Sequence, residues 1–115
     1  MREADQIADG LQIIQLALRE EPGFRTVAMP AGGLAVWYAG RRLAQLMADH
    51  GRSRGHALIY RRTPEDRERL EEHMDAPVVR DPSGSLSVSL HQEHEWNDLV
   101  RVLKATAAAV RDRTG

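Results

Sequence analysis

Cysteine is absent from this 115-residue chain, and aromatic residues make up only 4% of it. Without cysteine there is no disulfide, thiol nucleophile or thiolate metal site, and a reducing, cytoplasmic location is expected. No apolar run approaches the roughly 18 residues of a membrane span, and residues 1–5 (MREAD) are too polar to open a signal peptide. These features predict a protein with no membrane association and, at this length, one domain over residues 1–115.

Lysine is also scarce, because fifteen of the sixteen basic residues are arginine and only Lys104 is lysine. The formal net charge is −1, from 16 basic and 17 acidic residues. Dedicated nucleic-acid binders usually carry a clear positive charge, so the overall balance argues against that class.

Three segments have the three- and four-residue apolar spacing of amphipathic helices. The N-terminal helix would stop at Pro22 and Gly23, and the third would open on the acidic stretch at residues 93–98. Between them, Thr63 and Pro64 suit the cap and first position of a helix that ends near Met74. The expected apolar stripes are Ile7, Leu11, Ile14 and Leu18, widened by Ile13, Leu16 and Ala17, in the first helix, and Trp96, Leu99, Val100, Leu103, Ala107 and Val110 in the third.

Elsewhere the apolar period changes to two, which is typical of strands. The expected strands are residues 24–29, 34–38, 42–48, 56–61, 78–80 and 85–91. Residues 43–48 also fit a short helix, but the turn before them suits a hairpin, so we favour a strand. In the last strand, Leu86, Val88 and Leu90 should face inward and the serines, from Ser85 onward, outward.

These elements predict a single α+β domain, an antiparallel sheet of about five strands with the N- and C-terminal helices packed on one face. Trp37 alternates with Leu34, Val36 and Tyr38. If those three residues lie under the helices, Trp37 faces outward, into an interface or a ligand cleft. We therefore predict ligand-binding residues around Trp37; they are Trp37, Arg42, Tyr60 and Arg61.

Residues 41–62 form a locally basic segment. Its arginines are Arg41, Arg42, Arg52, Arg54, Arg61 and Arg62, and Asp49 is its only acid. Such a segment could neutralise phosphates, with Trp37, Tyr38 and Tyr60 offering stacking surfaces, so nucleic-acid binding is an alternative function. The acidic residues that follow it, between residues 65 and 75, could instead neutralise this charge.

His91 and His94 are the strongest metal candidates, because a spacing of three places both on one face of a helix. Glu93, Glu95, His50 or His56 could add ligands, but no motif fixes a third one. We find no nucleophile elbow, phosphate-binding loop or dinucleotide motif, and therefore expect no metal, no cofactor and no catalytic set. A small secondary-metabolism enzyme using His91 or His94 as acid or base is the remaining enzymatic alternative.

Three short motifs and the last helix resemble the bacterial "luciferase domain" family, which has no characterised function, and more distantly the MmcQ/YjbR-like domains. The motifs are residues 33–38 (GLAVWY), 40–43 (GRRL) and 81–88 (DPSGSLSV), followed by the helix from Trp96. Members of the family commonly have a His-rich segment after the Gly-Arg strand. Here Gln45 and Met47 occupy that strand, and only His50 and Gly51 follow it. The resemblance implies the α+β fold, favours a strand over residues 43–48, and implies no mechanism.

The sequence as a whole predicts a small non-enzymatic binding or accessory module. Its partner would be a small molecule or another protein, held on an exposed sheet face or in a cleft near Trp37. The oligomeric state does not follow from the residues.

Overall fold

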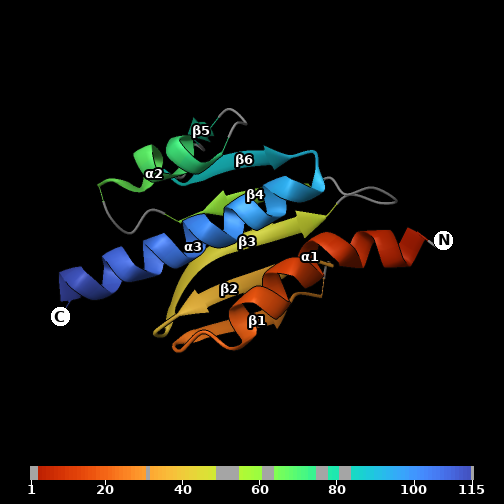
Figure 1. The fold of residues 1–115 in the computed structure, drawn as a ribbon, viewed down its shortest axis with the longest axis horizontal. Helices are drawn as coiled ribbons and strands as arrows, with labels where there is room; N and C mark the ends of the chain where they lie inside the picture. Colours follow the sequence, from red (N-terminus) through yellow and green to blue (C-terminus); the bar gives the residue numbers. More distant parts are fainter. Residues whose placement is uncertain are drawn as a thin grey trace.

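The computed structural model describes residues 3–30, 32–48, 55–60, 64–74, 78–80 and 84–114, without the side chains of residues 3–9, 79, 80, 113 and 114. The described residues form three helices and six strands (Figure 1). In chain order they are α1 (Glu3–Arg19), β1 (Phe24–Ala28), β2 (Leu34–Tyr38), β3 (Arg41–Ala48), β4 (Gly55–Ile59), α2 (Asp66–His73), β5 (Val78–Arg80), β6 (Leu86–Leu90) and α3 (Glu93–Thr114).

The strands form one antiparallel sheet in the order β1-β2-β3-β4-β6-β5. Helices α1 and α3 lie together across one face of it, and α2 packs beside α3 (Figure 1). The predicted fold class is confirmed, including the strand over residues 43–48. Because the outermost strands are β1 and β5, each has one side without a neighbouring strand in the described sheet.

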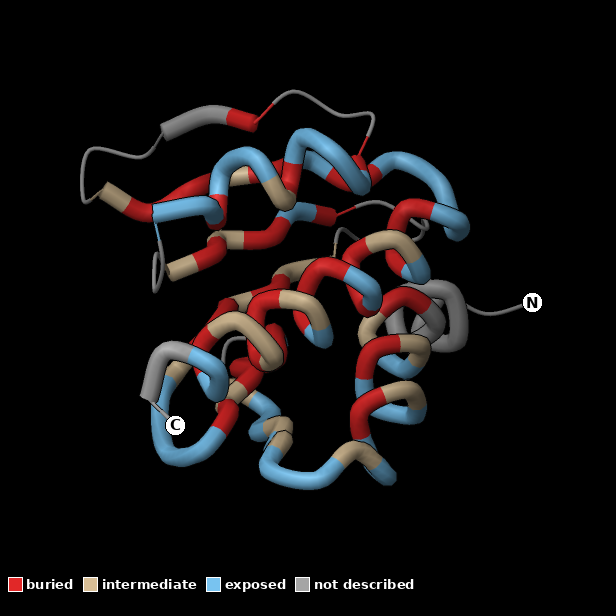
Figure 2. Tube along the Cα trace, turned by 60° about the vertical axis from the view of Figure 1, so that its left-hand side comes forward, coloured by how far each residue is buried: buried red, intermediate tan, exposed pale blue. Residues whose placement is uncertain are grey.

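The core lies between the helices and the sheet, where buried residues concentrate in Figure 2. In a strand, every second side chain points to the same face of the sheet. In β2 these side chains are Leu34, Val36 and Tyr38, which are buried under the helices. Helix α3 contributes the largest side chain, Trp96, which is fully buried. All six residues predicted for the stripe of α3 are buried: Trp96, Leu99, Val100, Leu103, Ala107 and Val110.

Three expectations of detail are wrong. Leu16 does not join the buried stripe of α1 and is 60% exposed. Helix α1 lies over the β1 end of the sheet, and no described strand lies beyond β1 to cover the side chain of Leu16. Ser85 is buried instead of facing solvent. Helix α2 begins at Asp66 rather than at Pro64; its N-cap residue, Glu65, makes no side-chain cap bond. The predicted cap, Thr63, and the side chain of Ile7 lie outside the described residues.

An ion pair with a buried carboxylate lies in the first turn of α2. The carboxylate of Asp66 is almost completely buried and lies 2.7 Å from the guanidinium of Arg69, one helical turn away. An acidic residue is favoured in the first turn of a helix, and a buried carboxylate needs such a partner. Together with the buried Leu70, this pair fixes the first turn against the domain.

The turn between β2 and β3 carries backbone strain that a substitution can relieve. Ala39 has a φ of 52° and Gly40 a φ of 81°, the paired positive values of the two-residue turns that favour Asn-Gly. We therefore expect Ala39→Asn to raise the free energy of unfolding by about 0.5–1 kcal/mol in urea denaturation. Ala39→Val should lower it, because a β-branched residue is poorly accommodated at positive φ; equal stability of the two variants would contradict this explanation.

Candidate functional site

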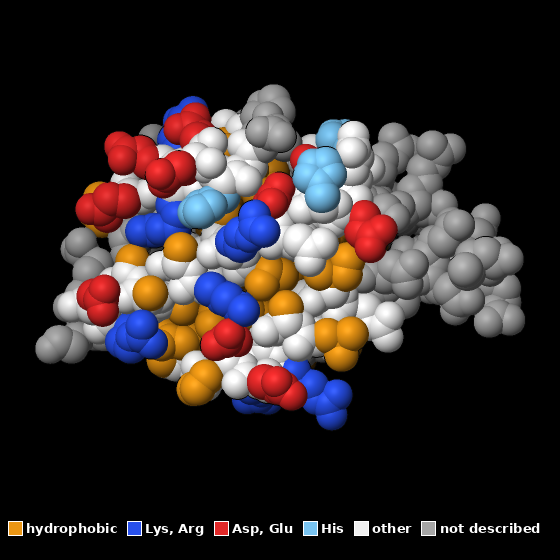
Figure 3. Space-filling model, viewed as in Figure 1, with side chains coloured by type: hydrophobic (Ala, Val, Ile, Leu, Met, Phe, Trp, Pro, Cys, Tyr) orange, Lys and Arg blue, Asp and Glu red, His pale blue; other side chains and the backbone are white. Residues whose placement is uncertain are grey.

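The face of the sheet opposite the helices is not covered by any described element. Figure 3 looks onto the other, helix-covered face, where acidic side chains gather over α2 and basic ones over α3. That face therefore carries mixed charge, including the exposed Arg67–Glu71 pair, whose nitrogen and oxygen lie 3.7 Å apart. Three of the four residues predicted around Trp37 are found on the uncovered face: Trp37, Arg42 and Tyr60.

Trp37 lies on this uncovered face, because it alternates along β2 with residues that point into the core. Its backbone partner on β3 is Arg42, whose guanidinium carbon lies 5.0 Å from the centre of the indole ring. This cation–π contact holds a positive charge beside a half-buried apolar surface. The structure thus brings together two of the four predicted site residues.

A β-bulge is what places Arg42 beside Trp37. Val36 pairs with Ala44 and Trp37 with Arg42, so Leu43 is an extra residue on β3. In regular alternation Arg42 would share the helix-covered face with Ala44 and Leu46. Because of this extra residue, the residues of β3 that precede it face the opposite side of the sheet from the one that regular alternation would give. The guanidinium of Arg42 therefore lies on the uncovered face.

Tyr60, the third predicted site residue, lies farther from Trp37 than Arg42 does, on the next strand of the sheet. Tyr60 follows β4, and its hydroxyl lies 3.3 Å from Oε1 of Gln45 on β3, to which it donates a hydrogen bond. It is therefore on the uncovered face, one strand beyond Arg42, but does not line the groove that contains Trp37. Arg61 lies outside the described residues, as do Arg52, Arg54 and Arg62 of the basic segment.

A groove of about 470 Å³ lies over β1, β2 and the start of β3; we call it the outer-face groove. Ala35 is small and its larger neighbours, Trp37, Val27 and Met29, stand around it, which produces the hollow. Its described lining residues are Arg25, Val27, Ala28, Met29, Pro30, Ala35, Trp37, Gly40 and Arg42. The groove is thus mainly apolar, with two arginines and no acidic residue among the residues described as lining it.

The contribution of β1 was not predicted from the sequence. Arg25 pairs with Trp37 and Val27 with Ala35, so the residues of β1 that face outward form one wall of the groove. The signal was available: once residues 24–28 and 34–38 are joined as a hairpin, alternation places Arg25 and Val27 on the face of Trp37.

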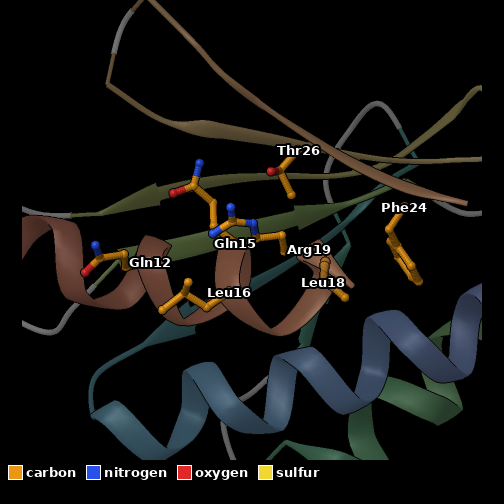
Figure 4. Close-up of a pocket in the computed structure, with 7 residues that line it drawn as sticks. All are labelled: Gln12, Gln15, Leu16, Leu18, Arg19, Phe24 and Thr26. Atoms are coloured by element: carbon orange, nitrogen blue, oxygen red, sulfur yellow. The ribbon is translucent and has the colours of Figure 1, made fainter. Parts of the chain in front are cut away.

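A second hollow, of about 490 Å³, lies on the other side of β1, between that strand and α1 (Figure 4). We call it the edge groove; its lining residues are Gln12, Gln15, Leu16, Leu18, Arg19, Phe24 and Thr26. Figure 4 shows the polar ends of Gln15 and Arg19 on the strand side of α1 and the hydroxyl of Thr26 above them. Phe24 closes one end and is stacked obliquely on Tyr38, with ring centres 4.9 Å apart.

The histidines do not assemble into a metal centre within the described part of the chain. His91 and His94 are both exposed, and the carboxylate of Glu95 is occupied: it accepts hydrogen bonds of 2.9 Å from the backbone N–H groups of His91 and Gln92. Glu95 therefore caps the start of α3. No group of three or more His, Asp or Glu residues that could hold a metal ion was found among the described residues, and His50 lies outside them.

Comparisons with protein-family models, with curated protein sequences and with solved structures found no match to this chain. The resemblance to the luciferase-domain and MmcQ/YjbR-like families therefore stays a prediction from the residues. No helix in the described part of the chain is both long and apolar enough to cross a lipid bilayer.

Proposed function

We propose that this protein is a small non-enzymatic binding or accessory module whose ligand, a small molecule or part of a protein partner, occupies the outer-face groove. The observation that carries this proposal is the Trp37–Arg42 stack in a groove on a sheet face that no described element covers. Ligand sites are typically apolar hollows of about 300–1,000 Å³ with a few fixed polar groups. The outer-face groove has that size and composition.

The lining residues define the chemistry of the ligand. Trp37, Val27 and Met29 offer contact to an apolar body, while Arg25 and Arg42 offer paired N–H donors to a carboxylate or phosphate. The contact with Trp37 also limits the freedom of the Arg42 side chain, which reduces the entropy that Arg42 loses when an anion binds. The favoured ligand therefore joins an apolar group to an anionic one.

A thermal-shift experiment with 1-naphthoate and decanoate tests this proposal, because each joins an apolar body to a carboxylate. A ligand with a Kd of about 0.1 mM, present at about 1 mM, adds about 1.4 kcal/mol of stability and should raise the Tm by about 5 °C. We expect the shift to disappear in Trp37→Ala and in Arg42→Gln, and to persist in Leu16→Ala, which alters only the edge groove.

Other outcomes of the same experiment separate the alternatives. A shift produced by a single-stranded oligonucleotide, and lost steeply as salt rises, would favour nucleic-acid binding through the arginines. Carboxylate shifts that survive both groove variants would contradict the outer-face groove as the site, and so would the absence of any carboxylate shift in the wild-type protein.

A further inference from the structure

The outer edge of β1 is an open hydrogen-bonding surface. Among the described strands, β1 is the last at its end of the sheet, and β2 is its only described partner. The amide of Met29 bonds to Gly33 and the carbonyl of Gly23 to Ala39, so the odd-numbered residues direct their backbone groups towards β2. By the alternation of antiparallel ladders, the N–H and C=O groups of Thr26 and Ala28 point outward. The exposure of Ala28 agrees with an uncovered edge.

Both sides of this edge are hollowed. The outer-face groove receives Arg25 and Val27 from β1, and the edge groove receives Phe24 and Thr26 from the same strand. A strand added beside β1 would direct successive side chains alternately to the two faces of the sheet. One extended segment could therefore fill both grooves at once, with every second side chain in each.

The charges around the two grooves select the segment. Arg19 lines the edge groove, while Arg25 and Arg42 line the outer-face groove. No acidic residue is among the described residues that line either hollow. Glu21, just after α1, is engaged 2.9 Å from the ammonium of Lys104, and Glu20 lines neither groove. A negatively charged segment is thus complementary to this edge.

We infer that the protein partner is an extended segment of alternating apolar and acidic residues, which pairs with the outer edge of β1 as an additional antiparallel or parallel strand. This inference rests on the proposed function, because the apolar side chains occupy the outer-face groove over Trp37 and Val27. The acidic side chains lie in the edge groove, where Arg19, Gln15 and Gln12 supply positive charge and N–H donors. Arg25 and Arg42, in the outer-face groove, add to the positive potential that attracts the acidic segment to this edge.

Fluorescence anisotropy with a labelled peptide, Val-Asp-Leu-Glu-Val-Asp-Val, tests the inference. Thr26→Pro is the decisive variant: its N–H points away from β2, so proline removes the donor offered to the peptide and no bond of the β1–β2 ladder. We expect Thr26→Pro to raise the Kd at least about tenfold, whereas Thr26→Val, which keeps the N–H, should stay within about twofold. Arg19→Gln should raise it about three- to fivefold.

The naphthoate shift separates the two proposals. If naphthoate stabilises the protein and the peptide does not bind, the strand-pairing inference fails and the proposed function stands; if neither binds, both fail. Peptide binding that is unchanged by Thr26→Pro would overturn the inference. It would also be overturned if sedimentation showed a wild-type dimer that Thr26→Pro converts to a monomer, because a second copy would then occupy the edge.

Discussion

Replacement of Trp96 by alanine is expected to lower the free energy of unfolding by about 3–5 kcal/mol, the range typical of a large aromatic side chain removed from a core. Trp96 is fully buried, and its ring joins three elements. A Cβ placed on Gly10 of α1 would lie 2.6 Å from the ring, and one placed on Gly55 of β4 would lie 3.0 Å from it. Because both positions are glycine, neither has a side chain that could move into the space that the alanine would leave.

Urea denaturation followed by circular dichroism measures this loss, and Trp37→Ala is the matched control. Trp37 lies half-buried on the uncovered face, so its removal should cost less than about 1.5 kcal/mol, mostly partial burial and the contact with Arg42. If Trp96→Ala is unfolded from the start, Trp96→Phe should still fold, with about half the loss. Equal losses for Trp96→Ala and Trp37→Ala would contradict the assignment of Trp96 as the central core residue.

The second large effect is expected from Gly55→Ala, which adds a single methyl group. The new methyl group would meet the carbonyl oxygen of Met47 and lie 3.0 Å from the Cα of Ala48, both in the backbone of β3. Backbone atoms of a paired strand cannot move aside as a flexible side chain can. We expect a loss of about 3 kcal/mol, at the upper end of the range for overpacking.

Gly40→Ala separates this steric effect from backbone strain. Gly40 has a φ of 81° but open space around the position of a Cβ, so its replacement should cost about 1 kcal/mol from the left-handed conformation alone. Gly55 is in the opposite situation, since it is not among the glycines with positive φ. Urea midpoints for the two variants that agree within error would show that the close contact at Gly55 is relieved without cost.

The fold could be predicted from the sequence because a strand or helix with one buried face repeats its apolar residues at the period of that element. The strand with Leu86, Val88 and Leu90 alternates almost perfectly, and all three side chains are buried under the helices. The exposure of Leu16 could not be predicted in this way. Its apolar character fits the stripe of α1, but its burial depends on whether a further strand lies beyond β1, which local spacing cannot indicate.

The candidate site was only half predictable. The outward orientation of Trp37 follows from its alternation with Val36 and Tyr38, and the structure agrees. The position of Arg42 depends on the extra residue in β3. Neither the turn residues nor the composition of this segment indicates a bulge there. The edge groove depends on the distance between α1 and β1, which is set by packing across the whole domain and not by either segment alone.

The bulge at Leu43 has a consequence for how this surface could change over time. Substitution at position 42 changes which chemical group stands beside the indole, but it leaves that position on the same side of the sheet. Loss or gain of a single residue in this arm of the hairpin would instead transfer the positive charge from one layer of the domain to the other. Among variants of this chain, insertions and deletions near residue 43 should therefore alter the polarity of the binding face more than replacements do.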